Sequence, residues 1–135
     1  VSCGHGPGGR CLQCAGRAVH NVPLPLYCAF YRAFGQGASS SSSSSSSSGA
    51  TASSATPELS FAAYAALSAA LAPEPTERLL HLGSGVGGAI VAWALLLPQS
   101  VASGVESCPA EHAAALAAAA RLPAPVRDRV FLHQG

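Results

Sequence analysis

A glycine-rich turn between a short strand and an apolar helix constrains this chain more than any other feature. Residues 79–82 (Leu-Leu-His-Leu) are predicted to form the strand and residues 83–87 (Gly-Ser-Gly-Val-Gly) the turn; the run that follows predicts a helix that stops at Pro98. Glycines allow a ligand to approach the backbone, and a helix N-terminus offers unpaired N–H groups with partial positive charge. The stretch therefore predicts a binding site for an anionic or nucleotide-like ligand.

An acidic residue follows this turn at the distance that a nucleotide site needs. The next predicted strand covers residues 100–106 and ends in Glu106, eighteen residues after Gly88. A carboxylate at this position can accept hydrogen bonds from both ribose hydroxyls of an adenosine cofactor. The turn and Glu106 together predict that the ligand contains adenosine.

The other elements alternate between helix and strand. Thr56 and Glu58 have the character of a helix start, with Thr56 as the cap, and residues 111–122 predict a further helix. Residues 129–135 predict a third strand. This order predicts an α/β fold, the first half of an open parallel Rossmann-like sheet. Right-handed crossovers would place the strands in the order 3-2-1, which leaves the first strand at an exposed edge.

Composition limits the partners that the chain is expected to have. It has 135 residues, a net charge of +1 and only 10% charged residues, so we expect no nucleic-acid-binding patch. The longest apolar run, residues 89–97, is about half of the ~20 residues that span a bilayer, so we expect no membrane partner. The chain begins with Val and contains no Met, and we expect it to be a fragment of a longer product.

Three segments are predicted from changes in composition. Residues 35–55 are nearly all Gly, Ala, Ser and Thr, which predicts a disordered linker because they offer no apolar side chains to offset the entropy of ordering. They separate a Cys/His-rich segment, residues 1–34, from the α/β part, residues 56–135. Phe30 and Phe34 share one face of a short helix that is expected to pack on a core or a partner.

The first segment contains four potential zinc ligands in the order Cys-x-His-x5-Cys-x2-Cys. They are Cys3, His5, Cys11 and Cys14. Two thiolates on one tight turn can bind the same ion, so the pattern predicts a structural zinc knuckle. A glycine-rich loop with ordinary thiols and a redox Cys-x2-Cys pair remain the alternatives.

The turn satisfies two glycine templates. Gly83, Gly85 and Gly88 fit the G-x-G-x-x-G fingerprint of dinucleotide-binding proteins. The first two with Gly87 instead fit G-x-G-x-G, the S-adenosylmethionine loop of class I methyltransferases. Neither match decides the ligand without its context.

That context resembles the DOT-type (disruptor of telomeric silencing) histone-lysine methyltransferases. The sequence L-G-S-G-V-G of the turn, followed by G-V-E at the end of the next strand, is similar to the family's D-L-G-S-G-V-G and G-V-E. The E-L-S-F that begins at Glu58 lies at the spacing of the family's Y-G-E-x-S-F motif, and residues 132–135 look like its third strand. The resemblance covers residues 56–135.

The resemblance implies a class I methyltransferase fold, S-adenosylmethionine as the cofactor, and methyl transfer to a lysine of histone H3 on the nucleosome, in the nucleus. It places Glu106 on the ribose and Glu58 on a loop that closes over the methionine end of the cofactor. The cofactor-binding residues that it implies are Glu58, His81, Gly83, Ser84, Gly85, Gly87 and Glu106.

The chain departs from the family at several positions. His81 replaces an acid that helps to hold the methionine amino group; a neutral imidazole can accept one hydrogen bond there but adds no negative charge. The family's adenine-contacting acid and its lysine channel follow the third strand and have no counterpart in the sequence. We therefore expect half of a cofactor site, no catalytic residues and no activity from these 135 residues alone.

Other functions remain open at this stage. The chain is also compatible with a class I methyltransferase that acts on a different protein or a small molecule, and with a nicotinamide-dependent oxidoreductase. A non-enzymatic alternative is an interaction module in which a zinc knuckle is joined to a degenerate methyltransferase-like fold; His81 and the Cys/His-rich segment favour it.

Overall fold

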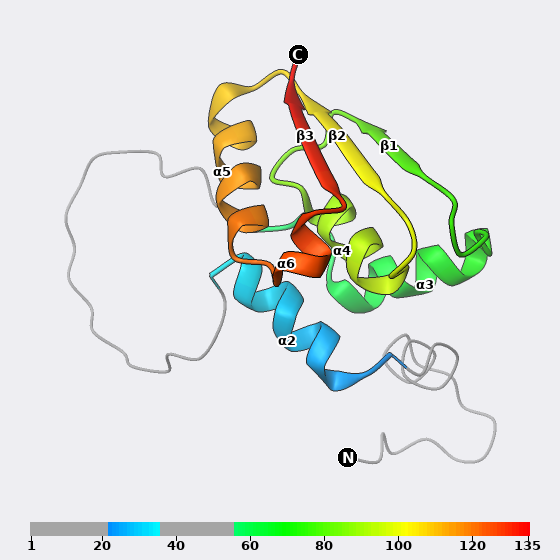
Figure 1. The fold of residues 1–135 in the computed structure, drawn as a ribbon. Helices are drawn as coiled ribbons and strands as arrows, with labels where there is room; N and C mark the ends of the chain where they lie inside the picture. The colour runs from blue at the N-terminus through cyan, green and yellow to red at the C-terminus, as the bar shows by residue number, and fades with distance from the viewer. Residues whose placement is uncertain (1–21, 36–55) are drawn as a thin grey trace, which may run out of the picture.

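A three-stranded parallel sheet forms the centre of the fold. The computed structural model describes residues 22–35 and 56–135 (Figure 1). Strands β1 (Leu79–Leu82), β2 (Ala102–Glu106) and β3 (Val130–Gln134) lie in the order β1-β2-β3, all parallel. Helices connect consecutive strands, so the predicted α/β fold, the first half of a Rossmann-like sheet, is confirmed together with its strand order. The candidate zinc ligands and residues 36–55 of the predicted linker lie outside the described residues.

Helix α4 (Gly88–Leu96) covers one face of the sheet and contacts all three strands. Leu79, Ala102 and Val130 are paired across the strands, and all three pack in the cluster formed with Ile90 and Trp93 of this helix. The helix is apolar all round and almost every residue is buried, as expected for a helix enclosed by other elements. It ends just before Pro98, as predicted.

The opposite face of the sheet is open among the described residues. Leu80 and Leu82 of β1 are 63% and 71% exposed, and Phe131 of β3 is 45% exposed. Successive strand residues point to opposite faces, so these side chains point away from α4. Within residues 22–35 and 56–135, β1 also pairs only with β2, so no described strand covers its outer edge, as the crossover rule predicts.

Helix α3 (Phe61–Leu71) begins later than the sequence indicated. Ser60 is the N-cap, and its hydroxyl accepts a hydrogen bond from the Ala63 N–H at 3.2 Å; the prediction of a helix start at residues 56–58 with Thr56 as the cap was wrong. Serine caps a helix as well as threonine does, and Phe61 is the first side chain here that is fully buried. Residues 56–60 are therefore free to lie against the glycine turn.

Helix α5 (Pro109–Ala120) and a short helical turn after it connect β2 to β3. Helix α5 begins two residues before the predicted start because Pro109 suits the first helical position, and it ends before the predicted Leu122. A single turn, α6 (Ala124–Arg127), follows Pro123 and was not predicted. Four residues are too few to show a periodic apolar pattern.

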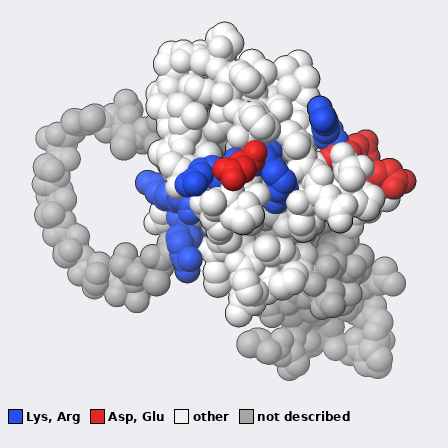
Figure 2. Space-filling model, viewed as in Figure 1, with Lys and Arg blue, Asp and Glu red and all other residues white. Residues whose placement is uncertain are grey.

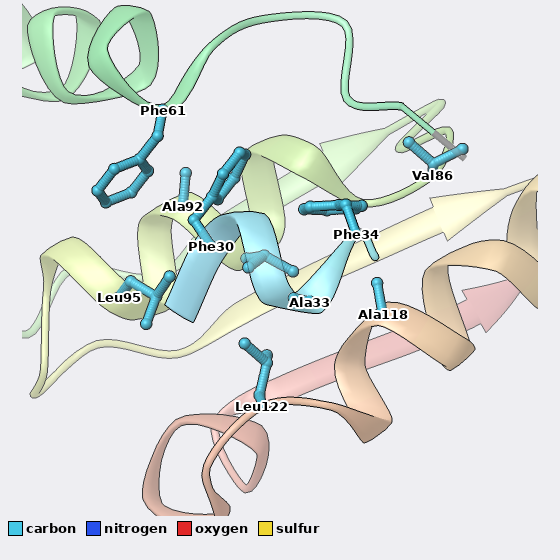
Figure 3. Packing of buried hydrophobic residues seen from close by; sticks show 10 residues of the cluster. Phe30, Ala33, Phe34, Phe61, Val86, Ala92, Leu95, Ala118 and Leu122 are labelled. Atoms are coloured by element: carbon cyan, nitrogen blue, oxygen red, sulfur yellow. The ribbon is translucent and has the colours of Figure 1, made fainter. Parts of the chain in front are cut away.

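Helix α2 (Leu24–Ala33) completes the core. Phe30 is fully buried and stacks on Phe61 with ring centroids 4.9 Å apart, while Ala33 and Phe34 pack in the same cluster with side chains of α4 and α5 (Figure 3). In sequence this helix belongs to the predicted Cys/His-rich segment, residues 1–34, and in the structure it shares one hydrophobic core with the α/β part. The apolar face that Phe30 and Phe34 share explains this packing.

Arg129 fastens the C-terminal end of α4. Its guanidinium donates hydrogen bonds to the carbonyl oxygens of Ala94, Leu97 and Ser100 at 2.8–2.9 Å, and its Nε donates to Pro125. The carbonyls of Ala94 and Leu97 lie at the C-terminal end of α4 and have no hydrogen-bond partner within that helix. The positive charge of Arg129 also complements the negative end of the α4 dipole. This residue therefore ties the start of β3 to the end of α4.

Candidate functional site

The glycine turn leaves β1 in a conformation that only glycine adopts easily. Gly83, Gly85 and Gly87 have φ values of +72°, +56° and +89°, whereas Gly88 is the first residue of α4 and has no positive φ. The three left-handed positions follow the G-x-G-x-G template. The geometry of the turn thus favours this template over G-x-G-x-x-G.

Two glycines allow neighbouring elements to approach the turn closely. A Cβ at Gly88 would lie 2.7 Å from the Tyr64 hydroxyl and 2.9 Å from Cβ of Pro57, distances at which something must shift. A Cβ at Gly87 would lie 3.3 Å from Cβ of Ala115, on α5. These contacts fix Pro57 and the start of α5 beside the turn, so that side chains from both segments reach it.

Glu106 joins the turn to the end of β2. It is only 6% exposed, and its Oε2 accepts a hydrogen bond from the Gly85 N–H at 2.7 Å, while Oε1 accepts one from the Cys108 N–H at 2.8 Å. These hydrogen bonds, the one from Cys108 first, lower the pKa of Glu106 below its ordinary value of 4.5 against the opposing effect of burial. The backbone and the hydroxyl of Ser107 also hydrogen-bond to this carboxylate, so a ribose hydroxyl would share its oxygens with Ser107.

Two further carboxylates border the turn at one point. A Cβ at Gly85 would lie 3.8 Å from Oε1 of Glu58 and 3.8 Å from Oε2 of Glu111. Tyr64 lies next to this group: burial raises its pKa, a hydrogen bond with the Leu59 backbone lowers it, and the Glu58 charge raises it further. The turn is therefore surrounded by three carboxylates that come from three different segments.

His81 lies on β1, two residues before Gly83, and one of its ring nitrogens has no hydrogen-bond partner. Its Nδ1 is buried and has no hydrogen-bond partner, although the residue as a whole is only half-buried. A buried polar atom without a partner carries a desolvation cost that a ligand or a rearranged side chain can relieve. This nitrogen is on the strand position where the resemblance implies a ligand-binding acid.

The structure gathers most of the predicted site residues around Gly85. The turn glycines, Glu106 and Glu58 lie together, and Ser84 is buried at the turn, where Gly104 leaves room for it: a Cβ at Gly104 would lie 2.7 Å from the Ser84 hydroxyl. Sequence reasoning missed Glu111, which it used only as a helix start, and Tyr64. The spacing Cys108-x-x-Glu111 was the available signal, because a glutamate three residues after a cap lies over the helix N-terminus.

No group of three or more His, Cys, Asp or Glu side chains within residues 22–35 and 56–135 is placed to hold a metal ion. Cys3, His5, Cys11 and Cys14 lie outside those ranges, so the zinc knuckle stays a prediction. In the same part of the chain, no helix is both long and apolar enough to cross a membrane.

A separate apolar cavity lies between α3, α4 and β1. Its volume is about 90 Å³, and it is lined mainly by aliphatic and aromatic side chains, among them Leu67, Leu71, Leu79 and Trp93. It offers no carboxylate or imidazole to a reacting group. The polar groups that could bind a ligand therefore lie at the glycine turn and not in this cavity.

Comparisons with known proteins give only partial similarities to solved structures. No protein-family model and no curated protein match the chain. The glycopeptide N-methyltransferase MtfA complexed with sinefungin aligns with a TM-score of 0.48 and 24% identity over 56% of this chain. YjhP from E. coli aligns with a TM-score of 0.44 and 27% identity over 53%. The alignments cover 29% and 28% of those chains, so this chain spans less than a third of either. Similarities this weak assign no function to this chain.

The hydrogen bonds of Glu106 make the stability of the fold depend on pH. Because its folded pKa lies below 4.5, the carboxylate stabilises the protein fully above about pH 4.5, and the contribution is lost as the pH falls through the folded pKa. The melting temperature of Glu106→Gln should therefore lie well below that of the wild type at pH 7 and approach it near pH 3. Asp128→Asn, which removes an exposed carboxylate after α6, corrects for the general effect of charge. A gap that stays constant from pH 7 to pH 3 would contradict the assignment.

Proposed function

We propose that the described residues form the cofactor-binding half of an S-adenosylmethionine-dependent methyltransferase. The observation that carries this proposal is the G-x-G-x-G turn bordered by the carboxylates of Glu58, Glu106 and Glu111. Such a turn allows close approach of a nucleoside, and three carboxylates suit a ligand that carries hydroxyl groups and positive charge. S-adenosylmethionine has both, in its ribose and in its sulfonium and ammonium groups.

The same geometry argues against a nicotinamide dinucleotide. A pyrophosphate needs free N–H groups at the turn, but the Gly85 N–H donates to Glu106 and the N–H groups of Gly83 and Ser84 both donate to the Val105 carbonyl. The negative phosphates would also meet Glu58 and Glu111 at close range. The oxidoreductase alternative therefore has less support than the methyltransferase.

Each residue of the site has a definite task in this proposal. Glu106 accepts hydrogen bonds from the ribose hydroxyls and keeps the turn seated on β2, and the turn glycines leave room for the nucleoside. The free Nδ1 of His81 is the group for the amino-acid end of the cofactor, whereas Glu58 lies over Gly85, on the side of the methionine chain that carries the sulfonium. The bound cofactor supplies an activated methyl group, and the protein's contribution is to position it.

The narrower proposal concerns the substrate. From the resemblance to DOT-type enzymes we propose that the complete enzyme methylates a lysine of histone H3 on the nucleosome, in the nucleus. One surface feature favours an anionic partner of this kind: basic side chains gather over α2, α5 and α6 (Figure 2), where Arg32, Arg121 and Arg127 are exposed. Arginine is well suited to bind phosphates and clustered carboxylates.

Binding of nucleosomes tests the narrower proposal. The chain should retard nucleosomes in a native gel, and Arg32→Gln combined with Arg127→Gln should weaken the shift at least threefold, or by about 0.7 kcal/mol. Arg78→Gln, an exposed arginine directly before β1, is the matched control. Equal binding by the double variant and the control would remove this support, and no binding by the wild type would count against the partner.

Binding of S-adenosylhomocysteine tests the cofactor assignment. The 135-residue chain should bind it in isothermal titration calorimetry, and Glu106→Gln should weaken binding about tenfold or more, because a buried carboxylate that accepts charged hydrogen bonds contributes about 1.5–3 kcal/mol. Asp128→Asn should bind like the wild type. Undiminished binding by a folded Glu106→Gln protein would refute the ribose assignment, and tighter binding of NADH would favour the oxidoreductase.

A further inference from the structure

Glu111 has a carboxylate that the fold itself does not use. The residue is the third of α5, the position from which a glutamate often accepts a hydrogen bond from the backbone N–H of the cap. Here the cap is Cys108, and its N–H donates to Oε1 of Glu106 at 2.8 Å instead. The carboxylate of Glu111 points toward Gly85. It is thus available to a ligand in the turn.

A second carboxylate without a partner reaches the same point. Oε1 of Glu58 and Oε2 of Glu111 each lie 3.8 Å from the position of a Cβ at Gly85, and no arginine forms an ion pair with either in residues 22–35 and 56–135. Two like charges close together repel each other, and within residues 22–35 and 56–135 neither carboxylate forms an ion pair that would offset this. A cation held at the turn would relieve the repulsion, whereas a neutral group would not.

The polar groups around the turn suit a cofactor that carries a sulfonium charge, a ribose and an amino-acid group. Gly85 carries no side chain between the two carboxylates, Glu106 is a buried acid for hydroxyl groups, and His81 of β1 has a buried imidazole nitrogen that lacks a partner. The carboxylates of Glu58 and Glu111 then face the part of the ligand that lies over Gly85.

We propose that Glu111, together with Glu58, makes the site selective for the charge of the cofactor, so that it prefers the cationic sulfonium donor to the neutral thioether product. This inference rests on the proposed function and deepens it. Sequence reasoning assigned no ligand role to Glu111. Its acid lies within reach of the turn only because Ala115 allows α5 to pack against Gly87.

The selectivity has a consequence for turnover. Transfer of the methyl group to the lone pair of an acceptor nitrogen would leave the carbon–sulfur electron pair on sulfur. The positive charge would pass to that nitrogen and leave the site with the methylated acceptor or with its released proton. The carboxylates then lose the cation that offset their repulsion. Glu111 and Glu58 would thus favour entry of the donor and departure of the product at the same site.

The ratio of two dissociation constants tests this inference. The wild-type chain should bind S-adenosylmethionine more tightly, relative to S-adenosylhomocysteine, than the Glu111→Gln variant does. The expected fall in the ratio is about three- to tenfold, the range for a carboxylate that is only half-buried. Both ligands carry the same ribose, adenine and amino-acid groups, so the ratio isolates the sulfonium charge. Because screening weakens the attraction, raising the salt concentration should lower the wild-type ratio as well.

Two further variants make the result decisive. Asp128→Asn removes the same formal charge at the other end of the sheet and should leave the ratio unchanged. Glu58→Gln should lower the ratio in the same direction as Glu111→Gln, which keeps the test valid if one variant folds poorly. If both ligands bind but neither substitution changes the ratio, the inference is overturned and the proposed function stands. If neither ligand binds the wild type, the proposed function itself fails.

Discussion

The hydrogen bond from the Gly85 N–H to the Glu106 carboxylate is the interaction on which the rest of the site depends. It is short, at 2.7 Å, it is buried, and it joins residues 21 apart in the sequence. With the hydrogen bonds from Gly83 and Ser84 to the Val105 carbonyl, it fastens the turn after β1 onto the end of β2. The turn conformation, the start of α4 and the position of the acid are therefore set together, and a change at one alters the others.

Close packing around that turn determines which side chains reach it. Gly88 allows Pro57 and Tyr64 to approach α4, which brings Glu58 to the site, and Gly87 allows α5 to approach, which brings Glu111. The core behind the turn continues into α2, whose aromatic side chains pack against Phe61. The glycines thus have two roles: Gly83, Gly85 and Gly87 provide left-handed backbone positions, and Gly87 and Gly88 leave space for the elements that carry the carboxylates.

Much of this fold could be predicted from the sequence, and the reasons for the failures are physical. β1, the glycine turn, the strand order and Glu106 followed from local patterns and the crossover rule. The cap of α3 was misplaced because Thr56 and Ser60 both suit an N-cap, and only burial of Phe61 decides between them. Glu111 was missed because its role depends on how closely α5 packs on Gly87, which no local pattern encodes.

The site assigned to the glycine turn can be mapped directly with nitrogen-15-labelled protein. Titration with S-adenosylhomocysteine should perturb the backbone amides of Gly83, Gly85 and Gly87 most, together with those of Glu106 and Cys108, because their N–H groups lie in or beside the hydrogen bonds that hold the turn. Amides that line the apolar cavity between α3, α4 and β1 should change little. Perturbations centred on that cavity, or none at saturating ligand, would contradict the account.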